Sequence, residues 1–387
     1  MAVLAAAAFV YVTAEIMPVG ALPVIAADLN VSEALVATLL ASYALVAAVT
    51  TVPLVRATSS WPRRRTLVVT LVCLTTSQII SAAAPTFAVL AAGRVLCALT
   101  HGLMWSVIAP IGVRLVPPTH AARATMSVYA GTGLALVVGS PLTAAMSDLW
   151  GWRLAVLAIS AAAAGVTVAA SLLLPAMAGT SAPAITAAAH TPWHRRNRNL
   201  VTMCLLTLAG VTGHFVSYTF IVIVIRDVVG VSGPNAAWLL AAYGAAGLTA
   251  MGLLALPGDR RPRATVVTCT AILTLMLATL AALSLGSRAS LVALVVGVVA
   301  IIGWGATATA VPPMLQSAAM RHCPDDPDAA SGLYVTAFQI GIMAGSLLGG
   351  LLYEHGGLTA ILSASAVLVG AVLAALVVSR DLLAAGT

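Results

Sequence analysis

The sequence predicts an all-α membrane protein with twelve transmembrane helices in two pseudo-symmetric bundles of six. Of its 387 residues, 61% are hydrophobic and only 7% are charged, and the mean hydropathy is +1.07. Soluble globular domains carry about 25% charged residues, so this composition excludes a water-soluble fold. A spanning helix needs about 20 apolar residues, and the chain therefore accommodates about twelve spans. The apolar runs are too long and too continuous for the strands of a membrane barrel.

The first six spans are apolar runs separated by charged residues or proline. Asp28 closes the first run, the basic stretch 56–65 closes the second, and Pro85 separates the third from the fourth. Arg114 begins the next loop, and Asp148 precedes the sixth run. These breaks predict helices at 2–27, 34–55, 66–84, 87–113, 124–147 and 153–174.

A polar stretch of small residues, prolines and arginines divides these spans from six more. It predicts an N-terminal bundle at 1–175, a cytoplasmic linker at 176–199 and a C-terminal bundle at 200–387. Breaks at Arg226, Asp259, Arg288, Arg321 and Glu354 separate the later runs. They predict helices at 200–225, 235–257, 264–285, 290–319, 329–352 and 358–379.

The two halves also repeat a short basic sequence at equivalent loops. Trp61-Pro62-Arg63-Arg64-Arg65 follows the second span, and Asp259-Arg260-Arg261-Pro262-Arg263 follows the eighth, about 200 residues later. Equivalent placement favours a duplicated bundle.

The distribution of arginine predicts the orientation in the membrane. All 18 residues counted as Lys or Arg are Arg. Fourteen lie in one set of alternate loops and at the C-terminus, whereas the opposite loops hold only Arg153, Arg226 and Arg288. Because positively charged short loops stay in the cytoplasm, we expect both termini there and the protein in the inner (plasma) membrane. Without Lys or a clustered basic face, a nucleic-acid partner is excluded.

Four ionisable side chains lie deep inside predicted spans. They are Glu15 in the first span, Arg94 and His101 in the fourth, and His214 in the seventh. Counting about 1.5 Å per residue from the outer helix ends places all four near the bilayer midplane. A charged residue there costs about 2.5 to 3.5 kcal/mol, so each is a functional candidate. Arg94, His101 and Trp105 share one helix face by their spacing.

Two interpretations of Glu15 are open. In the structural one, its carboxylate pairs permanently with Arg94 and holds the first span to the fourth. In the functional one, burial favours the protonated carboxyl group and a cationic partner favours the carboxylate, so Glu15 takes up and releases a proton. His101 and His214 are either hydrogen-bonded core histidines or parts of a proton relay. We predict proton coupling by Glu15, Arg94 and His101.

Several motifs resemble those of the drug and sugar efflux antiporters of the major facilitator superfamily. The first span reads Thr13-Ala14-Glu15-Ile16-Met17-Pro18-Val19-Gly20, and the fourth contains Gly93-Arg94 and His101-Gly102-Leu103-Met104-Trp105-Ser106. These are similar to signatures of bacterial arabinose and sugar exporters. The likeness extends through Arg123-Ala124, Gly139-Ser140-Pro141-Leu142 and Gly151-Trp152-Arg153, and is looser in the last six spans. It implies the major facilitator fold, with two parallel six-helix halves.

The fifth span resembles the antiporter motif of that family. Gly131 and Gly139 remove side chains from a helix interface, and Pro141 frees a backbone carbonyl. In that family, the loop between the second and third spans usually carries an Asp before its basic run. Here that region, 56–61, has no acid, which puts the Asp-based conformational latch in doubt in the first half. In the second half, Asp259 keeps an acid beside Arg260. Alternatively, both basic runs only anchor loops to anionic lipid headgroups.

The candidate substrate contacts are polar and aromatic residues at membrane depth. Most such aromatics serve packing, so we select by position. His214 and Tyr218 share a helix face, and Trp105 lies next to the predicted proton site. The full prediction is Trp105, His214, Tyr218, Tyr43, Phe338 and Gln339, drawn from a wider set that adds Gln78, Tyr129, Tyr243, Trp304 and Tyr334. Few fixed charges in such a cavity suit uncharged compounds.

Together these features predict a proton-coupled antiporter that exports small drugs or sugars by alternating access. The alternative is a proton-coupled symporter that imports a small solute on the same fold. An enzyme is not expected, because the sequence has no nucleophile motif, metal-spaced His cluster or paired carboxylates, and Asp325, Asp326 and Asp328 read as a solvated loop and helix start. We expect no cofactor or metal beyond the proton gradient, and function as a monomer in the lipid bilayer.

Overall fold

The fold is helical throughout the part of the chain that the structure describes. The computed structural model describes residues 1–31, 33–175, 177, 197–232, 234–286, 290–379 and 382. Within these ranges there is no strand, nine helices are long and apolar enough to cross a membrane, and two shorter apolar helices accompany them. One of the nine contains two of the predicted spans, so all twelve are represented. The predicted all-α membrane fold is confirmed.

By their contacts the residues form two compact units. Unit 1 comprises Met1–Leu200 and Ala319–Thr336, and unit 2 comprises Val201–Ala318 and Ala337–Thr387. Most of the predicted linker at 176–199 lies outside the described residues, so the predicted domain boundaries stay predictions.

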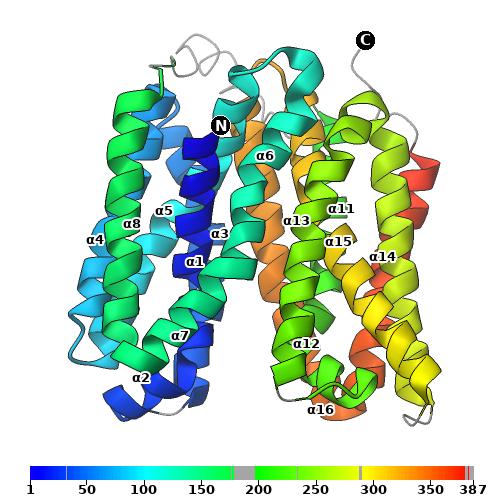
Figure 1. Cartoon of the computed structure of the whole chain (residues 1–387). Helices are drawn as coiled ribbons and strands as arrows, with labels where there is room; N and C mark the ends of the chain where they lie inside the picture. The colour runs from blue at the N-terminus through cyan, green and yellow to red at the C-terminus, as the bar shows by residue number, and fades with distance from the viewer. Residues whose placement is uncertain are drawn as a thin grey trace. The chain divides into compact units, whose positions relative to one another are not determined.

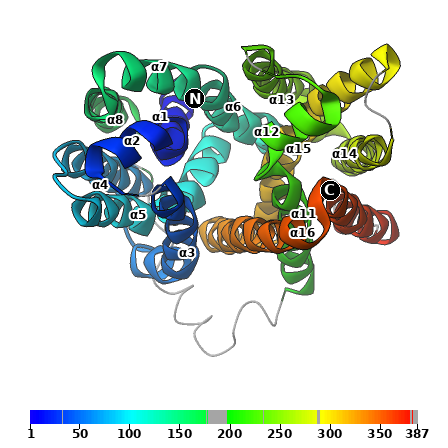
Figure 2. The ribbon, with the colours of Figure 1, turned by 90° about the horizontal axis from the view of Figure 1, so that it is seen from below.

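Unit 1 contains the first six spans (Figure 1). Helix α4 packs against α5 and α8, α3 packs against α5, and α1 packs against α6, α7 and α8 (Figure 2). The bounds are α1 (Ala2–Gly20), α2 (Leu22–Leu29), α3 (Glu33–Ala57), α4 (Arg63–Ala82), α5 (Phe87–Arg114), the 3₁₀ turn η1 (Pro118–His120), α6 (Ala121–Leu134), the π-helical turn η2 (Ala135–Gly139), α7 (Ser140–Trp150) and α8 (Trp152–Leu173).

The first span is interrupted, although the sequence predicts one continuous helix at 2–27. Helix α1 ends at Gly20, Ala21 has φ −108° and ψ 14°, and α2 begins at Leu22. Pro18 and Pro23 flank this break, and neither has an N–H for the carbonyl four residues before it. The prediction of one continuous helix was therefore wrong for the last two turns of the span, which form α2.

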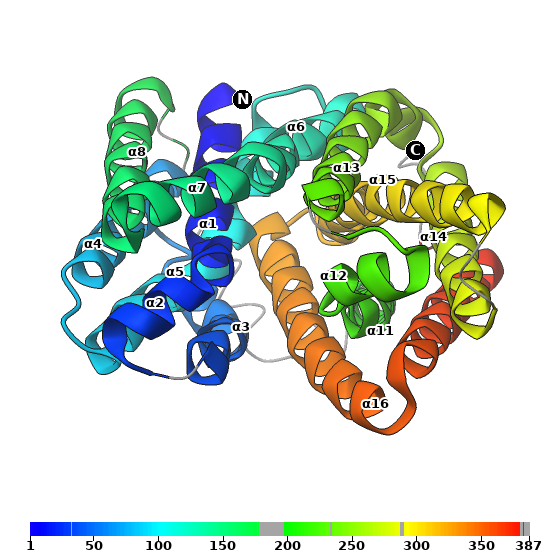
Figure 3. The same ribbon diagram turned by 60° about the horizontal axis from the view of Figure 1, so that its bottom comes forward.

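The fifth span also departs from a regular α-helix. Its predicted range 124–147 consists of α6, the π-helical turn η2 and α7, which ends at Trp150. Figure 3 shows α6 and α7 following one another along this span. A π-helical turn inserts one residue into the hydrogen-bond ladder and is frequent at functional sites. The seventh span carries a second such turn, η3 (Ile225–Val229).

Unit 2 contains the remaining spans and its own apolar core. The bounds are α11 (Arg198–Tyr218), α12 (Ile221–Val224), α13 (Pro234–Arg260), α14 (Pro262–Leu285), α15 (Leu291–Arg321) and α16 (Pro327–Val378). Trp304 lies at 0% exposure among the buried residues of this core, which come from α11 to α16.

Helix α16 contains the last two predicted spans, which fold back on each other at Gly357 (Figure 3). Gly357 has φ 61° and ψ −157°, a conformation that is essentially restricted to glycine. The sequence places the boundary between these spans at 353–357, in agreement with this kink.

Glycines bring the backbones of two helix pairs into direct contact, one pair in each unit. A Cβ on Gly131 would lie 1.9 Å from the carbonyl oxygen of Ala5, and one on Gly139 would lie 2.3 Å from Oγ1 of Thr13. In unit 2 a glycine ladder on α16 faces backbone atoms of α11 in the same way, through Gly341, Gly345 and Gly349. The fifth span therefore packs on the first as the eleventh packs on the seventh, which supports the predicted repeat.

A buried ion pair holds the beginning of α16 within unit 1. Asp328 Oδ2 lies 2.5 Å from Arg63 NH2 and 3.1 Å from Arg114 NH2, and the Arg63 and Asp328 side chains are each 1% exposed. Asp326 caps the same helix end by accepting a hydrogen bond from the Ala329 N–H. The sequence predicts a solvated loop and helix start for Asp325, Asp326 and Asp328. The helix does start here, at Pro327, but solvation was wrong for Asp328, because contact with two arginines removes this carboxylate from water.

The close contact at Gly131 predicts that Gly131→Ala destabilises the protein. The added methyl group would overlap the α1 backbone, and overpacking of this kind costs about 1 to 3 kcal/mol. Gly165→Ala on α8 is the matched control, because nothing lies within 4 Å of its Cβ position. Thermal unfolding of the purified proteins in detergent should show a lower Tm for Gly131→Ala alone. Equal Tm values would contradict the close packing.

The buried pair predicts that Asp328→Asn destabilises the protein more than Asp325→Asn, whose carboxylate is exposed. Removing one partner leaves a buried charge uncompensated, at a cost of about 3 to 5 kcal/mol. Adding Arg63→Gln to Asp328→Asn should recover part of the loss in Tm. A double variant that is less stable than Asp328→Asn would show that the charges do not compensate each other.

Candidate functional site

Glu15 lies on α1 beside His101 of α5. Its carboxylate Oε2 is 3.9 Å from Nε2 of His101, and the two side chains are 16% and 3% exposed. Both helices belong to unit 1. An acid and an imidazole at this separation are close enough to exchange a proton directly after a small movement or through one water molecule.

His101 is in turn held by Tyr43 of α3. The Tyr43 hydroxyl lies 2.8 Å from His101 Nδ1 and 3.3 Å from Cys97 Sγ. When the hydroxyl donates to Nδ1, the proton of the neutral imidazole is on Nε2 and faces Glu15. Tyr43, His101 and Glu15 thus form a polar chain across three helices. Tyr43 is predicted from the sequence as a substrate contact. In the structure its side chain is 2% exposed and contacts His101.

Arg94 is close to Glu15, but its hydrogen bonds go to the backbone. Its NH1 donates to the carbonyl oxygen of Ala14 at 2.5 Å and its NH2 to that of Glu15 at 2.8 Å. The guanidinium carbon also lies 4.9 Å from the ring centre of Tyr43. Among the described residues, no ion pair joins Arg94 to the Glu15 carboxylate. In the structure, Arg94 thus joins the first span to the fourth through the backbone of α1 and not through a paired Glu15 carboxylate.

Aromatic side chains surround this group, which we call the Glu15 site (Glu15, Tyr43, Arg94 and His101). The ring of Tyr11 lies 6.0 Å from that of His101, and its hydroxyl donates to the Thr70 carbonyl oxygen. Trp105 lies 6.2 Å from His101 and 4.9 Å from Tyr129. These rings give the polar chain a largely apolar environment, which strengthens the electrostatic interactions within it.

Unit 2 has an aromatic group of its own, which we call the His214 cluster (His214, Tyr218, Tyr243 and Trp304). The indole N–H of Trp304 donates to His214 Nδ1 at 3.0 Å, so the neutral imidazole carries its proton on Nε2. His214 stacks on Tyr218 with ring centres 5.0 Å apart, and Tyr243 lies 5.7 Å from Tyr218. The four-residue spacing of His214 and Tyr218 predicted their shared face, and the structure brings them together.

The remaining predicted residues lie elsewhere. On α16, Phe338 is half-buried and Gln339 is buried, with Oε1 of Gln339 lacking a hydrogen-bond partner among the described residues. Asp259 and Arg260 occupy the last turn of α13, where Arg260 is exposed. Pro141 is in the first turn of α7, and its side chain lies outside the described residues.

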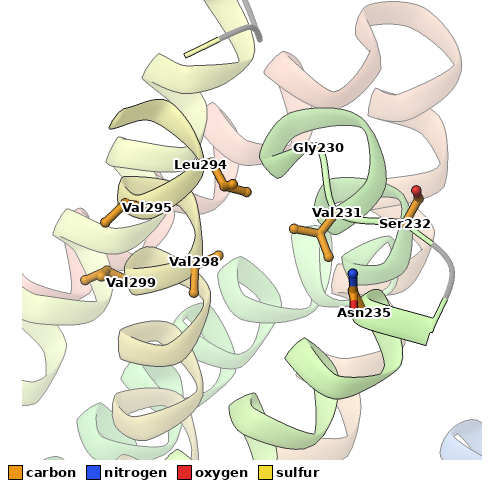
Figure 4. A pocket seen from close by; sticks show the side chains of 8 residues that line it. All are labelled: Gly230, Val231, Ser232, Asn235, Leu294, Val295, Val298 and Val299. Carbon is orange, nitrogen blue, oxygen red and sulfur yellow. The ribbon is translucent and has the colours of Figure 1, made fainter. Parts of the chain in front are cut away.

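A cavity of about 520 Å³ opens between the segment after η3 and α15 in unit 2 (Figure 4). Val231, Leu294 and Val298 supply apolar walls, and Ser232 and Asn235 supply polar groups. None of the predicted substrate residues lines it. Within the described ranges, no group of three or more His, Cys, Asp or Glu side chains could hold a metal ion.

Sequence reasoning missed the importance of Trp304 and Tyr243, which it placed only in the wider set of membrane-depth aromatics. Their contacts depend on the packing of α11, α13 and α15, which the spacing within one helix does not reveal. The signal that was present is a tryptophan in the middle of a long apolar run, because its N–H needs a buried partner.

Comparison with known proteins gives one family for the chain. The model of the Major Facilitator Superfamily matches residues 4–327 and 203–384. Chloramphenicol efflux pumps from the H37Rv and CDC 1551 strains of Mycobacterium tuberculosis are each 63% identical over 382 residues, which cover 99% of this chain and 92% of the relatives.

Two solved structures share the fold at low sequence identity. The human organic anion transporter MFSD10 has a TM-score of 0.74 and 16% identity, and covers 97% of this chain and 99% of its own. The Escherichia coli fucose:proton symporter FucP, as a single-substitution variant, has a TM-score of 0.76 and 14% identity, with 97% of each chain covered. With its helical fold and its close relatives, the chain belongs to the Major Facilitator Superfamily, in the drug-efflux branch, and is a transporter rather than an enzyme.

Proposed function

We propose that this transporter is a proton-coupled antiporter that exports chloramphenicol or similar uncharged drugs. The observation that carries the proposal is the Glu15 site, where a carboxylate in the middle of a span faces an imidazole that is itself bound to a buried phenol. The high identity to chloramphenicol efflux pumps supports the substrate class. Export of a sugar remains the second substrate class to test.

The coupling step is protonation of Glu15. His101 stands between Tyr43 and Glu15 and can present Nε2–H to the carboxylate, which stabilises the anion until a proton arrives. When the carboxyl group is protonated, the charge balance with Arg94 changes by one unit, and this change is available to bias one conformation over the other. Gly131 and Gly139 would let the fifth span move against α1 at short range.

In unit 2, the substrate-binding residues that we propose are His214 and Tyr218, joined by Trp304 and Tyr243 of the same cluster. In unit 1, we propose Trp105 separately. Flat aromatic rings and a few hydrogen-bonding groups suit a drug with an aromatic ring and no net charge, such as chloramphenicol. Phe338 and Gln339 remain candidates on α16, where the unpartnered Gln339 Oε1 could accept a hydrogen bond.

The arginine distribution supports a place in the cytoplasmic membrane with both termini in the cytoplasm. The proton gradient would supply the energy for transport, so we expect no cofactor. Twelve spans supply a complete pathway, so we expect the monomer to be the functional unit. Asp259 and Arg260, with Pro141 and the two glycines of the fifth span, are the proposed conformational elements.

The proposed coupling predicts that Glu15→Gln loses chloramphenicol transport driven by an imposed proton gradient. Glutamine keeps the side-chain volume but cannot carry the proton. Transport of labelled chloramphenicol in proteoliposomes should fall to background, and substrate-induced proton release should disappear. Glu354→Gln, an exposed carboxylate on α16, is the control and should transport normally. Full gradient-driven transport by Glu15→Gln would contradict the proposed proton coupling. The same transport assay with labelled arabinose in place of chloramphenicol tests the second substrate class.

The His214 cluster predicts that Trp304→Phe raises the KM for chloramphenicol. Phenylalanine keeps an aromatic ring but loses the N–H that orients His214, and one such hydrogen bond contributes about 0.5 to 1.5 kcal/mol, or about twofold to tenfold in affinity. Trp238→Phe on α13, which is 74% exposed, should leave KM unchanged. Equal KM values for both variants would place the substrate elsewhere.

A further inference from the structure

The backbone of α1 has an unfilled hydrogen-bonding position next to Glu15. In a regular helix, the carbonyl oxygen of Ala14 would accept a hydrogen bond from the N–H of residue 18. Residue 18 is Pro18, which has no N–H, and it lies inside the helix. A carbonyl group left without a donor in the membrane interior costs several kcal/mol, so another donor is required.

Arg94 supplies that donor from α5. Its two terminal nitrogens bind two consecutive carbonyl oxygens, NH1 to Ala14 and NH2 to Glu15. The planar guanidinium group matches this pair because its N–H groups form a rigid fork, whereas the ammonium group of Lys is a point charge on a flexible stem. Arg94 is 4% exposed, and its remaining Nε has no hydrogen-bond partner in the described part of the chain.

We propose that Arg94 is a positioning residue that completes the backbone of α1 at Pro18 and thereby holds the Glu15 carboxylate beside His101. Its bonds end on carbonyl groups, which do not titrate, so the guanidinium keeps its place when Glu15 gains or loses a proton. Arg94 is thus a fixed cation for the proton site and not a mobile partner that Glu15 releases. The consequence for transport rests on the proposed function, whereas the hydrogen bonds from Arg94 to the backbone of α1 do not depend on it.

The groups around Arg94 agree with this role. The Tyr43 ring faces the guanidinium from α3, and the same tyrosine positions His101 through its hydroxyl. Arg94 therefore contacts both ends of the polar chain: the backbone of Glu15 at one end and the ring of Tyr43 at the other. A change at Arg94 would displace Glu15 and Tyr43 together.

The test compares Arg94→Lys with the same change in a Pro18→Ala background. Arg94→Lys keeps the charge but cannot bridge two carbonyl groups, so we expect a lower Tm in detergent, about tenfold slower proton-driven chloramphenicol transport, and a shifted pH midpoint of that transport. Pro18→Ala restores the missing N–H. The double variant should therefore regain most of the Tm, return the pH midpoint towards that of the unmodified protein, and transport within about threefold of Pro18→Ala alone.

Three results would overturn the inference. The first is Arg94→Lys with unchanged Tm and transport, which would show that charge alone matters. The second is recovery of the Tm of Arg94→Gln by Glu15→Gln and not by Pro18→Ala, which would make the carboxylate the true partner. The third is recovery of Tm without recovery of the pH midpoint, which would leave Arg94 a purely structural residue. The Tm measurement does not depend on transport, so a failure of the proposed function would appear separately. In that case, chloramphenicol transport by the unmodified protein would be the same with and without an imposed proton gradient.

Discussion

In the interior of a membrane, a backbone carbonyl group that loses its helical partner has no water to bind instead, so every interruption of a helix must be compensated by the protein. The first span shows the consequence most directly. Pro18 removes one N–H, Arg94 replaces it from another helix, and this replacement brings a permanent positive charge next to Glu15. The proline inside the first helix and the proposed proton site are therefore linked through Arg94.

The same constraint limits where the helices may approach and bend. Glycines allow α6 to touch the backbone of α1, and a glycine ladder on α16 does the same against α11. Gly357 has a positive φ, a conformation that favours glycine, at the kink in α16. One π-helical turn lies in the middle of the fifth span and the other at the end of the seventh.

The repeat relates the two groups of functional candidates. Thr13 in unit 1 corresponds to Val216 in unit 2, because each faces the last contacting glycine of its partner helix. Two residues further along these helices lie Glu15 and Tyr218. The duplicated position thus carries an ionisable carboxyl group in one unit and an aromatic ring in the other, which agrees with proton coupling in unit 1 and substrate contacts in unit 2.

The sequence by itself determined the membrane class, the twelve spans and the residues Glu15, Arg94 and His101 of the site, because apolar run length and the cost of buried charge act locally along the chain. Tertiary structure alone decided the partners: Arg94 binds carbonyl groups and not a carboxylate, Tyr43 binds His101, and Asp328 is buried against Arg63. Such partners come from different helices, and hydropathy does not encode which faces meet. Pro18 inside α1 and the kink at Gly357 lie between these cases. The residue types mark both positions, but only the structure shows that Arg94 supplies the donor that Pro18 lacks and that Gly357 takes a positive φ.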